Sequence, residues 1–258
     1  MAFSIQKASF WKRLSAWMVD TVLVILLSMT FSLPVLQILN FDTYGQQMTS
    51  IQNEYKQQIE TQFELDLDIE KSEYENLPEH VKTQYDQATQ ALNDALGKDE
   101  TYTKLRADRV SLVVTDACIV LFISILLAHF VLPLLLKNGQ TLGKKVFGLA
   151  TVRTNGVKVS PTSLFIRSLV GLYAIETMAV AFFLLIYPVG VIAAILVQVL
   201  QIGVMIKTPT NSSIHDLLAD TVVVDFASQR IFETQEEREE YLAKLAQEEL
   251  SEHSGGQA

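Results

Sequence analysis

Five acidic or basic side chains stand inside long apolar stretches of this 258-residue chain: Asp20, Asp116, His129, Arg167 and Glu176. On insertion scales a charged side chain at the centre of a membrane helix costs about 2.5–3.5 kcal/mol, so such residues face protein or water. Two kinds of chemistry follow. The charges either pair across helices and lock their packing, or stacked acids relay protons or small cations.

The three apolar stretches that carry these residues cover 14–39, 110–136 and 164–206. Each exceeds the roughly 20 apolar residues that cross a bilayer core, and the third has room for two crossings, separated near Pro188. We therefore predict an all-α membrane protein, a bundle of four transmembrane helices. The first stretch is too long for a cleaved signal peptide and carries an early acid, so we expect it to remain as a helix.

These stretches divide the chain into six segments. They are 1–39, the N-terminus and first transmembrane helix; 40–109, an acidic extracytoplasmic segment; 110–136, the second transmembrane helix; 137–163, a basic cytoplasmic loop; 164–206, a transmembrane helical hairpin; and 207–258, a cytoplasmic tail with an acidic helix.

The distribution of Lys and Arg predicts the orientation of the bundle. Three basic residues and no acid precede the first helix, and segment 137–163 has five basic residues, Lys137 among them, and no acid. Basic loops stay on the cytoplasmic side, so both termini are predicted to be cytoplasmic and the protein to lie in the cell membrane. Segment 40–109, with seven basic and fifteen acidic residues, is then outside.

Segment 40–109 has two apolar stripes with helical spacing, in 48–63 and 81–95, which predict a helical hairpin above the membrane. Between them, residues 63–71 alternate with period two and suit a strand or an extended joint. Three acids there, Asp66, Asp68 and Glu70, lack the glycine and distal glutamate of a calcium loop, so we predict no metal site. In the tail, 233–252 predicts an exposed helix that helps solubility or docks a partner.

The loop 137–160 contains "GQTLGKK", which has the wrong spacing for a phosphate loop, so no nucleotide cofactor is expected. The following "VFGLATVRTNGVKVS" alternates around a turn and predicts a small cytoplasmic β-hairpin. Lys144 and Lys145 are predicted to bind anionic lipid headgroups.

Three blocks of the sequence together resemble the RDD family of bacterial multi-pass membrane proteins, which is named for one arginine and two aspartates. The blocks are Arg13-x-x-Ala16-x-x-x-Asp20, the stretch 138–152 followed by Arg167, and the stretch His215–Val223. The resemblance implies that Arg13, Asp20 and Asp216 are the signature charges. Asp220, where relatives often carry Gly or Lys, leaves open which of the two acids acts. Cation/proton exchange has been proposed for some members, whereas the activity of most is open.

Helix geometry predicts the partners of these charges. Arg13 lies about 10 Å from Asp20 along one helix and leans away from it, so each needs another helix. We expect Asp20 to pair with Arg167 or His129, and Arg13 with Asp216. On an α-helix Arg167 and Glu176, nine residues apart, would lie on opposite faces.

A structural or assembly role in which these pairs lock the bundle is the first hypothesis. Alternatives are a cation/proton or small-molecule transporter using Asp20, Glu176 and Asp116, and a partner-binding module in segment 40–109. No motif indicates an enzyme or nucleic-acid binding. Expected partners are the lipid bilayer and either a second copy or another membrane protein.

Overall fold

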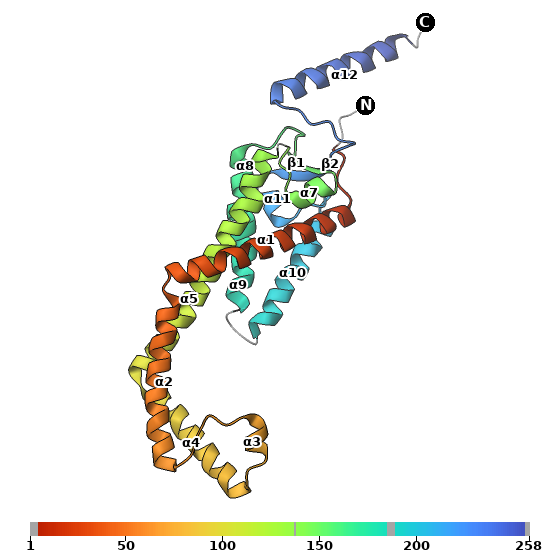
Figure 1. The fold of residues 1–258 in the computed structure, drawn as a ribbon. Coiled ribbons are helices and arrows are strands. Elements are labelled where there is room, and N and C mark those ends of the chain that lie inside the picture. Colours follow the sequence, from red (N-terminus) through yellow and green to blue (C-terminus); the bar gives the residue numbers. More distant parts are fainter. Residues whose placement is uncertain (1–4, 137, 185–188, 256–258) are drawn as a thin grey trace. The chain divides into compact units, whose positions relative to one another are not determined.

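The computed structural model describes residues 5–136, 138–184 and 189–255 (Figure 1). Lys137, which is counted among the basic residues of segment 137–163, lies outside the described residues. So do Tyr187 and Pro188, which make up most of the predicted break between the last two membrane helices. The chain forms two compact units. The first combines residues 1–29 with 120–258, and the second comprises 30–119.

Within these described residues, four helical stretches are long and apolar enough to cross a membrane, as the sequence predicts: Phe10–Ile38, Glu100–Leu135, Pro161–Phe182 and Gly190–Lys207. Large apolar side chains on them, among them Leu33 and Leu196, are exposed, which suits contact with lipid. The elements that build these stretches are α1 (Phe10–Ile38); α5 (Glu100–Ile125), η1 (Leu126–Val131) and α6 (Leu132–Leu135); α8 (Pro161–Phe165), η2 (Ile166–Thr177) and α9 (Met178–Leu184); and α10 (Val189–Lys207).

The third stretch is a π-helix over the twelve residues of η2. The hydroxyl of Thr177 donates to the carbonyl of Leu172, five residues back, at 2.8 Å. A π-helix has roughly 4.4 residues per turn because its hydrogen bonds run from i to i+5. Nine residues are then close to two full turns. The prediction that Arg167 and Glu176 lie on opposite faces is therefore wrong, because it assumed an α-helix.

A two-stranded antiparallel sheet is present, but its second strand is not the one that a hairpin would use. Strand β1 (Leu149–Arg153) pairs with β2 (Thr221–Asp225), with Thr151 opposite Val223. The predicted turn does form, because Gly156 N–H donates to the Arg153 carbonyl at 2.8 Å, but beyond it only an isolated bridge joins Val152 to Lys158. Four successive buried residues of β2 explain the preference for the distant strand.

Two short helices precede the strands, α7 (Leu142–Val146) before β1 and α11 (Ile214–Leu218) before β2. In the described part of the first unit, a further helix, α12 (Gln235–Gly255), follows β2. Phe232 at its approach is fully buried, and the Arg230 guanidinium lies 4.1 Å from the centre of the Tyr241 ring.

The second unit contains α2 (Phe41–Phe63), α3 (Lys71–Glu75) and α4 (Glu79–Lys98), and α2 packs on α4. Ile59 and Ala88, from the two predicted apolar stripes, are buried there. The segment between α2 and α3 is an irregular joint and not a strand. It is held by Tyr85, whose hydroxyl donates to the Leu67 carbonyl at 2.9 Å, and by an ion pair of Lys56 with Asp68.

Candidate functional site

Asp216 is the centre of a buried cluster of charges in the first unit. Its side chain is fully buried at the third position of α11. Arg13 of α1 donates to Oδ2, and Nε of Arg167 of η2 donates to Oδ1 at 2.9 Å. Nη2 of Arg167 lies 2.7 Å from the same oxygen as part of this ion pair. The Ser213 backbone N–H, at 3.2 Å, and hydroxyl, at 2.8 Å, also donate to Oδ2. One carboxylate thus joins three segments that are far apart in the sequence.

Electrostatics keep this carboxylate ionised. Burial alone would raise the pKa of Asp216, but the positive charges of Arg167 and Arg13 outweigh burial and hold the pKa well below its usual value. The two guanidiniums are almost as buried as their partner, with 7% and 6% of their side chains exposed. The pairing of Arg13 with Asp216 is the one that the sequence led us to expect.

His215 and Glu176 form a second contact between α11 and η2. One carboxylate oxygen of Glu176 accepts the backbone N–H of His215 and its Nδ1, both at 2.9 Å. The other ring nitrogen, Nε2, lies 3.1 Å from Nη2 of Arg167 and 3.0 Å from the Ser213 hydroxyl. At Gly171, between the two contacting turns of η2, an added Cβ would lie only 2.6 Å from the Cβ of His215, so a larger residue would push the helices apart.

Asp20 is held by a helix end and not by a cation. Its Oδ1 accepts the Gly143 backbone N–H at 2.7 Å and its Oδ2 accepts the Thr141 hydroxyl at 2.5 Å. Thr141 is the N-cap of α7, and an added Cβ at Gly143 would lie 2.1 Å from the Ala16 carbonyl oxygen. The N-terminus of a helix attracts a carboxylate because its N–H groups lack partners within the helix.

The predicted pairing of Asp20 with Arg167 or His129 is therefore wrong. Arg167 is committed to Asp216, and Asp20 has no ion pair within 4.0 Å among the described residues. His129 instead accepts the Ser168 hydroxyl on its backbone carbonyl at 2.5 Å, which joins η1 to η2.

Lys144 does not face lipid headgroups, in contrast to the prediction. Only 7% of the residue is exposed, and its Nζ donates to the Thr151 hydroxyl at 2.8 Å. Burial, with the charge of Arg167 as the next cause, holds the pKa of Lys144 well below its usual value. Lys145, the next residue, is exposed and stays available for headgroups.

The cluster is organised by two helix–strand units of the same length. The first starts at the N-cap Thr141 and has a left-handed residue, Gly148 (φ 65°), seven positions later, directly before β1. The second starts at the N-cap Ser213 and has Asp220 (φ 52°) seven positions later, directly before β2. Because the two strands pair antiparallel, the units are related by an approximate twofold axis.

The same position of each unit binds an acid from a membrane helix. The second helical residue of α7, Gly143, donates its N–H to Asp20 of α1, and the second helical residue of α11, His215, donates its N–H to Glu176 of η2. Asp20 and Glu176 are therefore structural counterparts. Asp20 is 3% exposed and Glu176 8%.

Two predicted residues lie outside this arrangement. Asp220 is exposed, and its carboxylate accepts the Thr154 hydroxyl and lies 3.6 Å from Arg153, so Asp216 is the acid that joins the helices. Asp116 belongs to the second unit, where it is buried and accepts the Ser32 hydroxyl at 2.7 Å, with its other oxygen unpaired.

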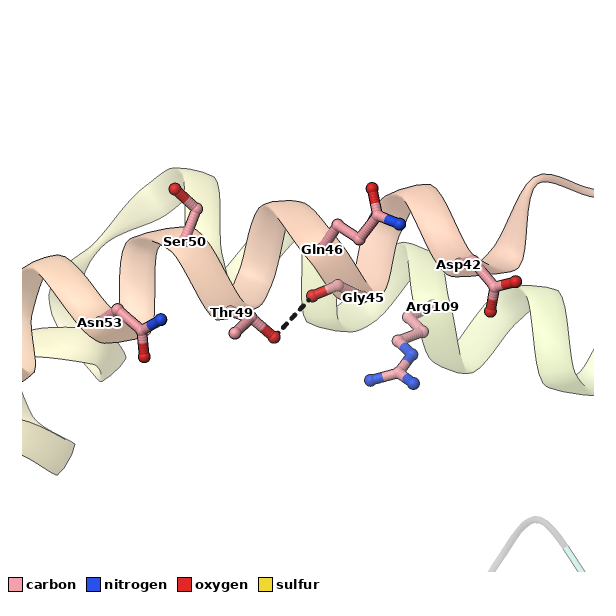
Figure 2. A pocket seen from close by; sticks show the side chains of 7 residues that line it. All are labelled: Asp42, Gly45, Gln46, Thr49, Ser50, Asn53 and Arg109. Carbon is pink, nitrogen blue, oxygen red and sulfur yellow. Dashed lines mark hydrogen bonds between the residues drawn. The ribbon is translucent and has the colours of Figure 1, made fainter. Parts of the chain in front are cut away.

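The second unit also contains a shallow polar hollow between α2 and α5 (Figure 2). The guanidinium of Arg109 lies in this hollow and 4.5 Å from the centre of the Phe41 ring. The other lining side chains come from one face of α2, where the Thr49 hydroxyl donates to the Gly45 carbonyl at 3.0 Å. No residue of the charge cluster lines it.

Sequence reasoning missed the neutral members of the cluster, among them Thr141, Gly143 and Gly171. Their role is to supply hydroxyl and backbone donors or to permit close approach, and neither role has a charge that stands out in an apolar stretch. A usable signal exists in the common spacing from a Thr or Ser N-cap to a left-handed residue before a strand.

Comparison with known proteins gives a single family. The family model described as the RDD family matches residues 7–220. The match includes every residue of the buried cluster and ends directly before β2, so it leaves out β2 and α12. No curated protein and no solved structure matches the chain.

Proposed function

The chain belongs to the RDD family, a family of membrane proteins, and we propose that it acts as a structural or assembly component of the cell membrane. In this proposal the buried charges lock the helix bundle. The observation that carries it is the set of contacts that Asp216 makes. Its Oδ1 accepts from Arg167 of η2, and its Oδ2 accepts from Arg13 of α1 and from Ser213 at the start of α11.

The two acid–helix contacts support the same role. In a membrane, each backbone N–H without a hydrogen-bond acceptor costs on the order of several kcal/mol. A five-residue helix that lies against a membrane span therefore needs acceptors for the N–H groups of its first turn. Asp20 and Glu176 provide them. They thereby fix α7 on α1 and α11 on η2, and through them the sheet.

The orientation and partners that we propose follow from charge. Both termini are cytoplasmic, Lys145 lies at the anionic headgroups, and the acidic segment 40–109 faces outward, where it recruits another membrane protein or a second copy. Deleting residues 46–97 is expected to abolish co-purification of that partner, while the bundle accumulates normally. Loss of the bundle itself would contradict a separate binding segment.

The experiment that tests the structural role compares Asp20→Asn with wild type in two assays. A locking role predicts less protein in the membrane and a lower melting temperature for the variant, and no pH-gradient-coupled cation flux in proteoliposomes of the wild type. Flux in the wild type that disappears in a variant of normal abundance would refute the locking role.

Transport of protons or small cations is the second candidate, and one observation favours it. Glu176 lies within a candidate membrane span, and one of its carboxylate oxygens lies 2.9 Å from Nδ1 of His215, so an acid and an imidazole meet there. Flux that is lost in Glu176→Gln at unchanged abundance would support this function.

A further inference from the structure

The contacts of Asp20 with the start of α7 and of Glu176 with the start of α11, called here the Asp20 joint and the Glu176 joint, differ in one respect that bears on proton binding. At the Asp20 joint, the donors are a hydroxyl and a backbone N–H, neither of which titrates in the physiological range. At the Glu176 joint, one donor is the imidazole of His215. The approximate twofold relation thus pairs a fixed joint with one that can take up a proton.

The contacts of His215 define its neutral form. An arginine only donates, so the nitrogen that faces Arg167, Nε2, must be the acceptor. The proton of the neutral ring is then on Nδ1, which donates to Glu176. In this tautomer the contacts of the ring with Glu176 and Arg167 are hydrogen bonds, whereas the Ser213 hydroxyl, whose one proton goes to Asp216, faces Nε2 without donating to it. The charges of Arg13 and Arg167 are balanced by those of Asp216 and Glu176.

We propose that His215 and Glu176 form a proton-binding site, and that uptake of one proton on Nε2 of His215 expels Arg167 from the ring and loosens α11 from η2. The added N–H would point at an N–H of Arg167 across 3.1 Å. It can donate instead to the Ser213 hydroxyl, 3.0 Å away, which itself donates to Asp216. One hydrogen bond between α11 and η2 is lost, and the ring gains a positive charge 3.1 Å from the Arg167 guanidinium.

Among the residues that the structure describes, the other groups around the ring do not provide a further counter-charge. From η2 the facing charges are Arg167 and Glu176, and from α11 itself Asp216, 3.7 Å from Nε2 and already held by two arginines. The charges of Lys144 on α7 and Arg13 on α1 also act on Asp216 and oppose a further positive charge.

In the described part of the chain, the elements that pack on the back of α11 add no free acid. Strand β2 contributes Asp225, which pairs with Lys12, and α10 contributes Lys207, which is exposed. His129 of η1 adds no negative charge in either of its protonation states.

The test is hydrogen exchange of the full chain in lipid nanodiscs, followed by mass spectrometry between about pH 8 and about pH 5, the range in which histidine titrates. After correction for intrinsic exchange, the amides of α11 should exchange at least about tenfold faster at the acidic end, the size expected when one hydrogen bond to a charged group is lost. His215→Asn keeps a donor near Nδ1 but does not titrate, so its α11 should be equally protected at both ends. His80→Asn, at an exposed histidine of the second unit, should behave like wild type.

A wild-type α11 with pH-independent protection, or a pH response that survives in His215→Asn, would overturn the proposal. If His215→Asn does not accumulate, Glu176→Gln replaces it. The neutral amide still accepts both donors but no longer favours the protonated ring, so the response should move to lower pH, and an unmoved response would count against the site. This inference rests on the proposed locking role but fails separately, because locking is measured at neutral pH and the proton site only by the pH dependence.

Discussion

Asp216→Asn is the substitution that most directly probes the buried cluster. The side chain keeps its shape, but one carboxylate oxygen becomes an NH2 group. Oδ1 accepts only from Arg167, and Oδ2 accepts from Arg13 and Ser213. In either orientation of the amide, its NH2 group faces a guanidinium that also only donates, and two buried arginines lose their counter-charge.

The expected cost follows from this geometry. Removing one partner of a buried ion pair costs about 3–5 kcal/mol, because the remaining charge stays buried without compensation. With two arginines dependent on one carboxylate, we expect the upper part of that range. Such a loss is a large fraction of the stability of a typical domain, so we also expect a severalfold fall in cellular abundance.

A matched control exists four residues away. Asp220 is exposed and its ion pair with Arg153, at 3.6 Å, is at the surface, where such pairs contribute about 0–1 kcal/mol. Asp220→Asn also keeps a residue type that tolerates the left-handed conformation at this position. Thermal unfolding of both variants in nanodiscs, followed by the fluorescence of Trp11 and Trp17, compares them directly. Equal melting temperatures for the two variants would refute the assignment of Asp216 as the central acid.

Three further predictions concern packing and pH. Gly143→Ala should prevent accumulation of the folded protein, because the added Cβ would overlap the backbone of α1. Gly97→Ala is the control: no atom lies within 4 Å of its new Cβ, so its stability should match or exceed that of the wild type. Immunoblots of membranes measure the abundance of both variants. The pKa of Lys144 is lower in the folded chain than in the unfolded chain, so between these two pKa values the unfolded chain binds more protons. The melting temperature should therefore rise with pH toward about 10.5, the usual pKa of lysine. Lys144→Met should flatten this rise, and the control Lys145→Met should not. Because the folded pKa of Asp216 is held below its usual value, its stabilising contribution is present at neutral pH and is lost only as pH falls through that lowered value. The difference in melting temperature between wild type and Asp216→Asn should therefore stay constant above about pH 4 and shrink at lower pH.

The membrane helices and the outer helices could be predicted because each depends on a long local pattern. Three apolar stretches of sufficient length, and two stripes that include Ile59 and Ala88, specify helices without knowledge of the rest of the fold. The sheet partner could not be predicted in the same way. Both Val157–Lys158 and β2 offer alternating or apolar residues to β1, and the choice depends on burial that only the assembled unit provides.

Of the candidate site, the sequence allowed us to predict only an ion pair between two charged side chains. Arg13 and Asp216 are visible in the sequence as isolated charges, and their pairing follows from depth. The acceptor role of Asp20 is not visible, because its donors are a hydroxyl and a backbone N–H. The relation of Arg167 to Glu176 depends on the π-helix η2, which lies close to His215 of α11 at Gly171, and a sequence pattern based on α-helical spacing does not predict it.

The twofold arrangement gives a physical reason for acids within membrane helices of this protein. Helices as short as α7 and α11 are not stable alone, because nucleation of a single turn is unfavourable. Each gains stability from the strand that follows and from a carboxylate at its N-terminus. Moving that carboxylate by one residue would turn it away from the helix, so Asp20 and Glu176 also set the position of each membrane helix relative to the sheet. Asp20 of α1 and Glu176 of η2 are then two instances of the same contact between a carboxylate and a helix N-terminus, and they differ in that His215 donates to the second one through its ring.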